Sequence, residues 1–216
     1  MLNDADNTLS PRSKRWQIAP VAPPAHLQQF GDLPRLVVQI LYNRGVTSPN
    51  QVADFLNSNP PIRNPLETPK LKGLDKAVAR LRRAIQRREP VAVYGDYDVD
   101  GVTATVLLTQ TLTALGADAR PYIPDRVDEG YGLNKEALGK LHGEGVRVVV
   151  TVDCGMRFPA EIAYARQQGM DVIVTDHHVP GDEPLEALAV INPRQPGCTY
   201  PYEELAGVGL AYKLAQ

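Results

Sequence analysis

Residues 146–152 read VRVVVTV, and residues 91–95 read VAVYG. Both runs are short, rich in β-branched residues and free of polar alternation, which is typical of strands buried on both faces. Three further runs have the same character, namely 119-ARPYI, 171-DVIVT and 188-LAVI. Strands of this kind occur in parallel sheets covered by helices, so these runs predict an α/β fold.

The segments between the runs have helical spacing near 102–115, 134–144 and 158–168. Strand and helix therefore alternate along the chain. We expect a parallel sheet with helices on both faces.

A further helix is predicted just before the first strand. Val78, Leu81 and Ile85 share one face of it. The opposite face is basic, and we interpret it as a solvated surface, with a track for a nucleic-acid backbone as the alternative. Its members are Lys76, Arg80, Arg83 and Arg87.

The N-terminal third is different, since ten of the nineteen prolines precede residue 70. We predict a flexible tail at 1–25, a helical leader at 26–72 and the α/β domain at 73–216. One leader helix is expected within 33–43 and another after Ser48-Pro49, because Ser caps helices and Pro suits the first turn. Their apolar residues are Leu36, Val37, Ile40 and Leu41 in the first, and Val52, Phe55 and Leu56 in the second.

Composition excludes several classes of protein. The 216 residues are 43% hydrophobic with a net charge of −2, which excludes wholesale disorder. No run approaches the ~18 apolar residues of a membrane span, and the N-terminus lacks the apolar core of a signal peptide. Two cysteines cannot form a disulfide framework, so we expect a cytoplasmic protein. We also expect a monomer that has no membrane partner. Charge is segregated, because residues 70–90 hold eight Lys or Arg against two acids, a local +6.

Polar residues gather where the expected strands end. The loops are 96-DYDVDG, 124-PDRVDEGYG, 153-DCG and 176-DHH. Ligands of open parallel sheets bind beyond the carboxyl ends of the strands. We therefore expect these loops to form the functional site.

Three alternate aspartates in one loop repel one another unless a cation lies among them. Carboxylate and imidazole donors suit Mn²⁺ or Mg²⁺, and a pair of such ions can activate water for displacement at phosphorus. Gly101 would permit close backbone approach, and the following helix N-terminus favours a phosphate oxygen.

Each loop also has a plainer interpretation. An EF-hand needs Glu at position twelve, but Leu107 stands there and a strand precedes Asp96. Singly, an aspartate at a strand end is often a helix cap, adjacent histidines can be surface residues, and Cys154 fits a packed thiol better than a nucleophile. Acid or imidazole at three successive strand ends favours a metal site.

These residues resemble the DHH phosphoesterase family, named for the triplet at 176–178. The likeness runs from about residue 33 to 216 in the family's order. A helical leader like 41-LYNRGVTSPNQVADFLN is a feature of the family's single-stranded-DNA exonucleases. The other matching segments are YGDYDVDGVTAT (94–105), YIPDRVDEGYGLN (122–134), VVTVDCG (149–155), VIVTDHH (172–178) and LAGVGLAYKLAQ (205–216).

The resemblance implies hydrolysis of single-stranded DNA from the 5′ end with Mn²⁺ or Mg²⁺, in DNA repair or recombination. It implies that His178 lies near the scissile phosphate and acts with Asp98 and Asp153 in catalysis. Arg126, Gly101 and Tyr131 are expected to bind substrate. The implied metal ligands are Asp96, Asp98, Asp100, Asp153 and His177.

Two departures from the family pattern bear on activity. Tyr94 stands where some relatives have a histidine, which would leave one ion less tightly held. The family core also continues to a further aspartate and a second domain. We therefore expect the domain at 73–216 to be incomplete, its second metal site to be incomplete, and this chain alone to be weakly active or inactive.

Alternative functions remain open from the sequence. A smaller-substrate DHH phosphodiesterase would act on oligoribonucleotides or small nucleotides, and a degenerate relative would bind nucleic acid without catalysis. The segment 205-LAGVG also resembles the hairpin of a helix-hairpin-helix unit, but residues 201–204 leave room for barely one preceding turn.

Overall fold

The five expected strands form one parallel sheet in the computed structural model, which describes residues 18–56 and 70–216. The sheet order is β2-β1-β3-β4-β5. The α/β prediction is confirmed. The strands are β1 (Val91–Tyr94), β2 (Ala119–Tyr122), β3 (Val148–Val152), β4 (Asp171–Thr175) and β5 (Ala189–Ile191).

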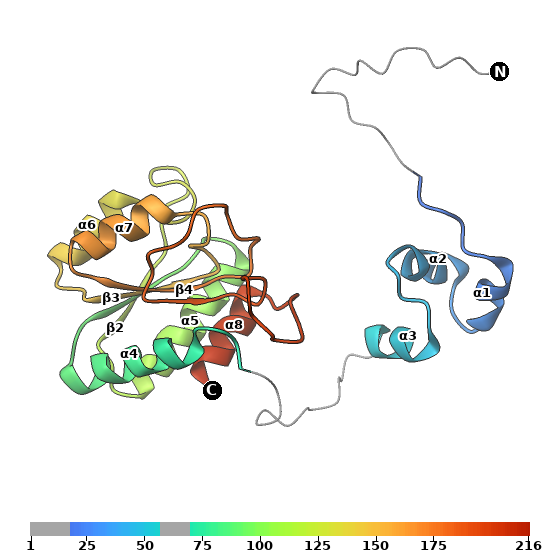
Figure 1. Cartoon of the computed structure of the whole chain (residues 1–216), viewed down its shortest axis with the longest axis horizontal. Helices are drawn as coiled ribbons and strands as arrows, with labels where there is room; N and C mark the ends of the chain where they lie inside the picture. Colours follow the sequence, from blue (N-terminus) through green and yellow to red (C-terminus); the bar gives the residue numbers. More distant parts are fainter. Residues whose placement is uncertain (1–17, 57–69) are drawn as a thin grey trace, which may run out of the picture. The chain divides into compact units, whose positions relative to one another are not determined.

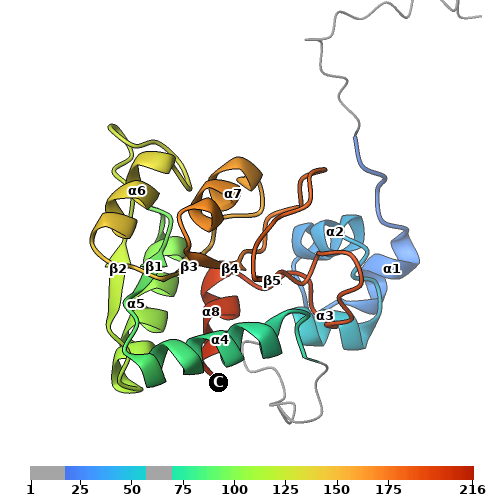
Figure 2. The ribbon, with the colours of Figure 1, turned by 60° about the vertical axis from the view of Figure 1, so that its left-hand side comes forward.

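Helices cover both faces of this sheet (Figures 1 and 2). One face carries α4 (Leu74–Arg87), α5 (Val99–Ala114) and α8 (Gly207–Ala215). The other carries α6 (Lys135–Gly143) and α7 (Pro159–Gln167). The helices expected near 102–115, 134–144 and 158–168 are thus confirmed as α5, α6 and α7.

Alternate residues of the central strands pack into two separate hydrophobic cores, one on each face of the sheet. Val148 and Val150 of β3 pack with Leu108 and Leu210 on one face, whereas Val149 packs with the α6 and α7 side chains on the other. All five residues of β3 are buried. Each fully buried aliphatic side chain contributes about 1.5–3 kcal/mol, so the uninterrupted apolar run stabilises both layers at once.

The strand order fixes where the site can form. From β1 the chain crosses to β2 on one side and then returns to β3 on the other side of β1. The loops after β1 and β3 therefore diverge, which opens a crevice at the carboxyl ends of these neighbouring strands.

The chain divides into two compact units, residues 1–63 and 64–216. In the described part of the first lie α1 (Pro24–Gln29), α2 (Arg35–Asn43) and α3 (Pro49–Leu56). The two helices expected in the leader are present, while α1 was not predicted and begins inside the expected tail. Residues 1–17 of that tail, and residues 57–69 of the predicted leader, lie outside the described residues.

The buried face of α2 differs from the expected one. Val38 and Leu41 are buried, whereas Leu36 and Ile40 are 71% and 47% exposed. The side chain of Gln39 accepts a hydrogen bond from the Ala22 backbone N–H and donates to the Pro20 carbonyl. These bonds hold α2 against residues 20–22. Helical spacing alone does not predict this contact.

The basic face of α4 also departs from expectation at one position. Arg80 is 7% exposed, and its guanidinium pairs with Glu89 at 2.6 Å and Asp171 at 2.5 Å. The interpretation of Arg80 as a solvated or DNA-tracking residue is wrong, because its side chain is buried in ion pairs with Asp171 of β4 and with Glu89, which follows α4. Lys76, Arg83 and Arg87 are exposed. Among the described residues, no helix combines the length and apolar character needed to cross a membrane.

Candidate metal centre

The carboxyl ends of β1, β3 and β4 each deliver a buried aspartate to the crevice. Asp96 follows β1, Asp153 follows β3 and Asp176 follows β4, and the three are at most 4% exposed. The neighbouring register of β1, β3 and β4 brings the three loops together. The loops that the sequence marked at these strand ends therefore meet at one edge of the sheet.

The first loop turns directly into α5. Asp98 is the N-cap of that helix, and its Oδ1 accepts a hydrogen bond from the Gly101 N–H at 2.9 Å. A Cβ on Gly101 would lie 2.5 Å from the Asp96 carbonyl oxygen, so glycine is required here for packing against the protein's own backbone. The close neighbour of Gly101 in the structure is Asp96, and the approach of a phosphate to Gly101 stays a prediction.

Asp153 has an unusual backbone and an unusual carboxyl group. Its φ of 62° lies in the left-handed region, and its N–H donates to the Thr175 carbonyl at 3.0 Å. The side chain is 2% exposed, and its buried Oδ1 has no hydrogen-bond donor of good geometry among the described residues. Burial raises the pKa of Asp153 to about 8, and the negative charges of Asp100 and Asp98 act in the same direction.

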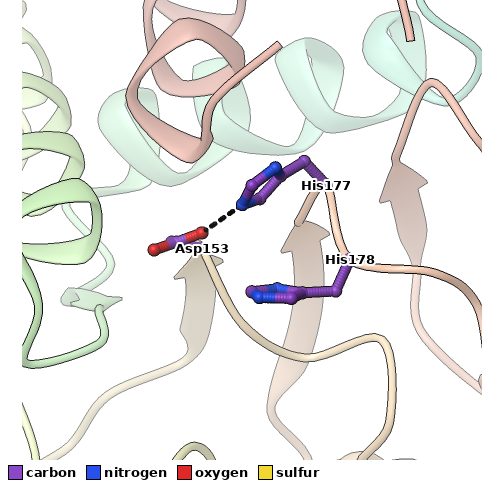
Figure 3. A group of neighbouring side chains, drawn as sticks. All are labelled: Asp153, His177 and His178. Carbon is purple, nitrogen blue, oxygen red and sulfur yellow. Dashed lines mark ion pairs between the residues drawn. The ribbon is translucent and has the colours of Figure 1, made fainter. Parts of the chain in front are cut away.

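The two histidines are held differently. His177 Nε2 lies 3.0 Å from Asp153 Oδ1, and in Figure 3 its ring points at that carboxylate. His178 Nδ1 lies 2.7 Å from Asp176 Oδ1, and its backbone N–H donates to the same oxygen. This bond to Asp176 raises the pKa of His178. The other oxygen of Asp176 accepts the Met156 N–H, so Asp176 fixes the ring from a buried position.

Asp153 belongs to two groups of potential metal ligands. Asp96, Asp98 and Asp153 form one group, and Asp153, His177 and His178 form the other; within each, the ligand atoms lie within 4.8 Å of one another. Oxygen and imidazole donors around a shared buried carboxylate fit divalent cations such as Mn²⁺ or Mg²⁺. The residues present therefore fit the expected metal site, and the unsatisfied Oδ1 is the strongest local sign that this carboxylate binds a cation.

Asp100 is anchored more firmly than the sequence suggested. Its two oxygens accept the backbone N–H groups of Gly207 and Val208, each at 2.7 Å. Oδ2 also lies 3.7 Å from His177 Nε2. The segment 205–209 thus begins α8 beside the site, and the described residues form no helix-hairpin-helix unit there.

The remaining predicted residues lie around the rim. The Arg126 guanidinium stands over the Tyr97 ring at 5.2 Å, and Tyr131 lies between Tyr97 and Phe158 in a row of aromatic contacts. Tyr94 is fully buried, and its Oη donates to the Gly132 carbonyl. Its side chain therefore holds the loop 124-PDRVDEGYG, which follows β2. Cys154 is a packed thiol, as expected, since it is 0% exposed.

A cleft of about 510 Å³ adjoins the histidines. Two arginines that sequence reasoning did not single out, Arg157 and Arg194, line it together with the histidine pair. Their signal was weak, because isolated arginines in loops are common. The lining residues are Tyr131, Arg157, Phe158, Asp176, His177, His178, Val179, Arg194, Glu204 and Ala206.

Comparison with known proteins agrees with this geometry. The model of the DHH family, N-terminal domain, matches residues 90–216, which is more than half of the chain. The chain belongs to the DHH family. The triplet at the end of β4 that carries this name is the one that places His177 and His178 beside Asp153.

Several DHH proteins are similar over most of the chain. The single-stranded-DNA-specific exonuclease RecJ of Bacillus subtilis is 43% identical over 181 residues, covering 83% of this chain and 23% of that protein. A crystal structure of exonuclease RecJ bound to manganese is 42% identical with a TM-score of 0.61, covering 67% of this chain and 37% of that one. RecJ of Thermus thermophilus in complex with Mn²⁺ is 31% identical with a TM-score of 0.61, covering 93% of this chain and 28% of that one. The chain thus spans about a quarter of the curated B. subtilis relative.

Proposed function

We propose that this chain is the metal-binding DHH portion of an exonuclease that hydrolyses single-stranded DNA from the 5′ end and releases mononucleotides. The observation that carries the proposal is Asp153, whose buried carboxyl group is shared by two groups of potential ligands. Its Oδ1 has no hydrogen-bond donor of good geometry among the described residues, although His177 Nε2 lies 3.0 Å away. The similarity to RecJ proteins supports the substrate class. A cytoplasmic monomer active in DNA repair or recombination is the corresponding cellular role.

The proposed ligands divide into two sets. Asp96, Asp98 and Asp153 would hold one divalent ion, and Asp100, Asp153 and His177 would hold the other. Mn²⁺ or Mg²⁺ supplies Lewis acidity and lowers the pKa of water when bound. The sharing of Asp153 by both sets supports a two-ion arrangement.

The remaining side chains act on the substrate. Nδ1 of His178 is held by Asp176, and this contact raises the pKa of His178 and so favours the imidazolium form. In that form Nε2–H would donate a hydrogen bond or a proton to an oxygen of the scissile phosphate. Arg126 would bind a phosphate and Tyr131 a terminal base, since exposed rings stack on single-stranded bases. The N-terminal turn of α5 at Gly101 lies next to this group and favours an anionic oxygen.

The decisive experiment uses two single-stranded oligonucleotides, labelled at the 5′ or the 3′ end. The protein assayed is the full-length exonuclease of which this chain is the proposed DHH portion. In Mn²⁺ we expect it to give labelled mononucleotide from the first oligonucleotide and progressively shorter labelled strands from the second. Asp98→Ala, His177→Ala and EDTA should each reduce release to background. Asp118→Asn is the matched control, because Asp118 precedes β2 at the opposite end of the sheet.

The substrate panel separates the competing functions. Faster hydrolysis of oligoribonucleotides or small nucleotides than of DNA would contradict the proposed substrate. It would still be consistent with metal-dependent phosphodiester hydrolysis at this centre. Affinity for DNA without turnover in Mn²⁺ or Mg²⁺ would indicate a binding relative. Unchanged activity in Asp98→Ala would contradict the assigned centre.

A further inference from the structure

A contact between α8 and the acidic loop carries an inference about how the metal centre is held. Asp100 lies in the first turn of α5, and Gly207 and Val208 open α8 more than a hundred residues later. The two N–H groups reach separate oxygens of one carboxylate, both at 2.7 Å. This two-point attachment fixes both the position and the rotation of the Asp100 carboxylate.

The start of α8 depends on this contact as well. Its N-cap is Ala206, which has no side chain able to accept a hydrogen bond. The first N–H groups of a helix have no partner within the helix and need an outside acceptor. Asp100 supplies that acceptor, and its charge is also favourable at the positive end of the helix. Leu210 and Leu214 then pack on the core cluster that includes Leu108 and Leu112 of α5.

Gly207 places the same turn against the other central carboxylate. A Cβ added at Gly207 would lie 2.6 Å from the Asp153 Cβ and 2.7 Å from its Oδ1. These distances are below any normal van der Waals contact, so a methyl group here must displace Asp153 or α8. Glycine is required at this point because the helix end and the buried carboxylate occupy adjoining space.

We infer that the Gly207–Val208 turn is a positioning element of the metal centre, which aims the Asp100 carboxylate and sets the place of Asp153. The inference rests on the proposed metal centre, and it concerns how two of its ligands are held. Gly207 and Val208 act through the carboxylates rather than on the substrate. Outer partners of metal ligands commonly contribute about 10- to 100-fold in metal affinity.

The test is Mn²⁺ titration of Gly207→Ala in the full chain, by calorimetry and by the electron paramagnetic resonance spectrum of the bound ion. We expect affinity to fall about 10- to 100-fold, with an altered spectrum. The matched control is Gly209→Ala, two residues along α8, where the nearest atom to the added Cβ is the movable end of Leu205 at 3.2 Å. That control should keep wild-type affinity, although both substitutions remove a helix glycine.

A second measurement does not depend on the variant folding. Amide hydrogen exchange of the metal-free wild-type chain should show Gly207 and Val208 protected, despite their place at the start of a helix. Exchange at the rate of an unstructured peptide would overturn the inference. So would wild-type Mn²⁺ affinity in Gly207→Ala. If the wild-type chain itself bound no Mn²⁺, the proposed metal centre would fail, which the titration reports separately.

Discussion

At the scale of single residues, the candidate site holds an ionisable carboxyl group, that of Asp153, in a buried position that does not favour folding. Asp153 is buried, lies near the carboxylates of Asp98 and Asp100, and has no donor of good geometry on Oδ1 among the described residues. Holding a buried carboxyl group with its pKa raised to about 8 lowers the free energy of unfolding at neutral pH, so this side chain destabilises the metal-free fold. The proposed role of Asp153 in metal binding and the stability of the metal-free fold therefore favour different side chains at this position.

This conflict gives a prediction for Asp153→Asn. The amide keeps the shape of the side chain and tolerates the left-handed backbone at φ 62°. It has no acidic proton, so at neutral pH the variant avoids the free-energy cost of raising the pKa of a buried carboxyl group. In EDTA we expect the variant to be more stable than wild type by about 1–2 kcal/mol, measured by urea denaturation. In Mn²⁺ the order should reverse, because the variant loses a carboxylate that we propose as a metal ligand. Asp118→Asn, on an exposed pair with Arg120, should change neither value appreciably.

The outcome that would contradict this account is a less stable Asp153→Asn protein in EDTA. That result would mean that the contact with His177 at 3.0 Å already compensates the charge without any metal.

At the scale of elements, sequence patterns predicted what depends on local spacing. Runs rich in β-branched residues marked β1, β3, β4 and β5, whereas β2 contains Arg120 and Pro121 and is a partly exposed edge strand. Acid or imidazole after β1, β3 and β4 marked the site, because strand ends converge in a parallel sheet. Contacts between distant segments were not predictable in this way. The spacing of α4 does not show that Arg80 turns inward to Asp171, ninety-one residues later. Likewise, nothing local to 205-LAGVG shows that Asp100 accepts hydrogen bonds from the first N–H groups of α8.

The burial of Arg80 leads to a prediction about α4. This arginine ties the helix to Asp171 at the start of β4 and to Glu89 in the turn before β1. Removing it leaves two acids facing a buried gap, and breaking a buried pair costs about 3–5 kcal/mol. Because Asp171 is 44% exposed and regains water, we expect Arg80→Ala to cost about 3 kcal/mol, the low end of that range.

Urea denaturation of the α4 variants checks this figure. Arg83→Ala on the exposed side of the same helix is the control and should stay within about 0.5 kcal/mol of wild type. Equal effects of the two substitutions would contradict the burial of Arg80 and would indicate that its side chain is solvated like that of Arg83.

At the scale of the whole molecule, the site belongs to one of the two compact units. Asp96, Asp153 and Asp176 come from strands within residues 64–216, and both core clusters lie within residues 71–214. The hydrogen bonds that fix Asp100 and His178 also join residues of this unit. The architecture that makes the metal centre is therefore contained in the second unit.

We accordingly expect residues 64–216, expressed without the first unit, to fold and to bind Mn²⁺ with the affinity of the longer chain. The melting temperature of the sheet domain should change by less than about 2 °C, equivalent to less than ~1 kcal/mol for a domain of this size. Calorimetric Mn²⁺ titration and thermal denaturation in EDTA, on both chains, measure these two quantities. A large loss of metal affinity with an unchanged melting temperature would show that the leader contributes to the centre directly. A loss of both would show instead that the sheet domain needs the leader in order to fold, because the affinity of the centre depends on the packing of β1, β3, β4 and α8 around it.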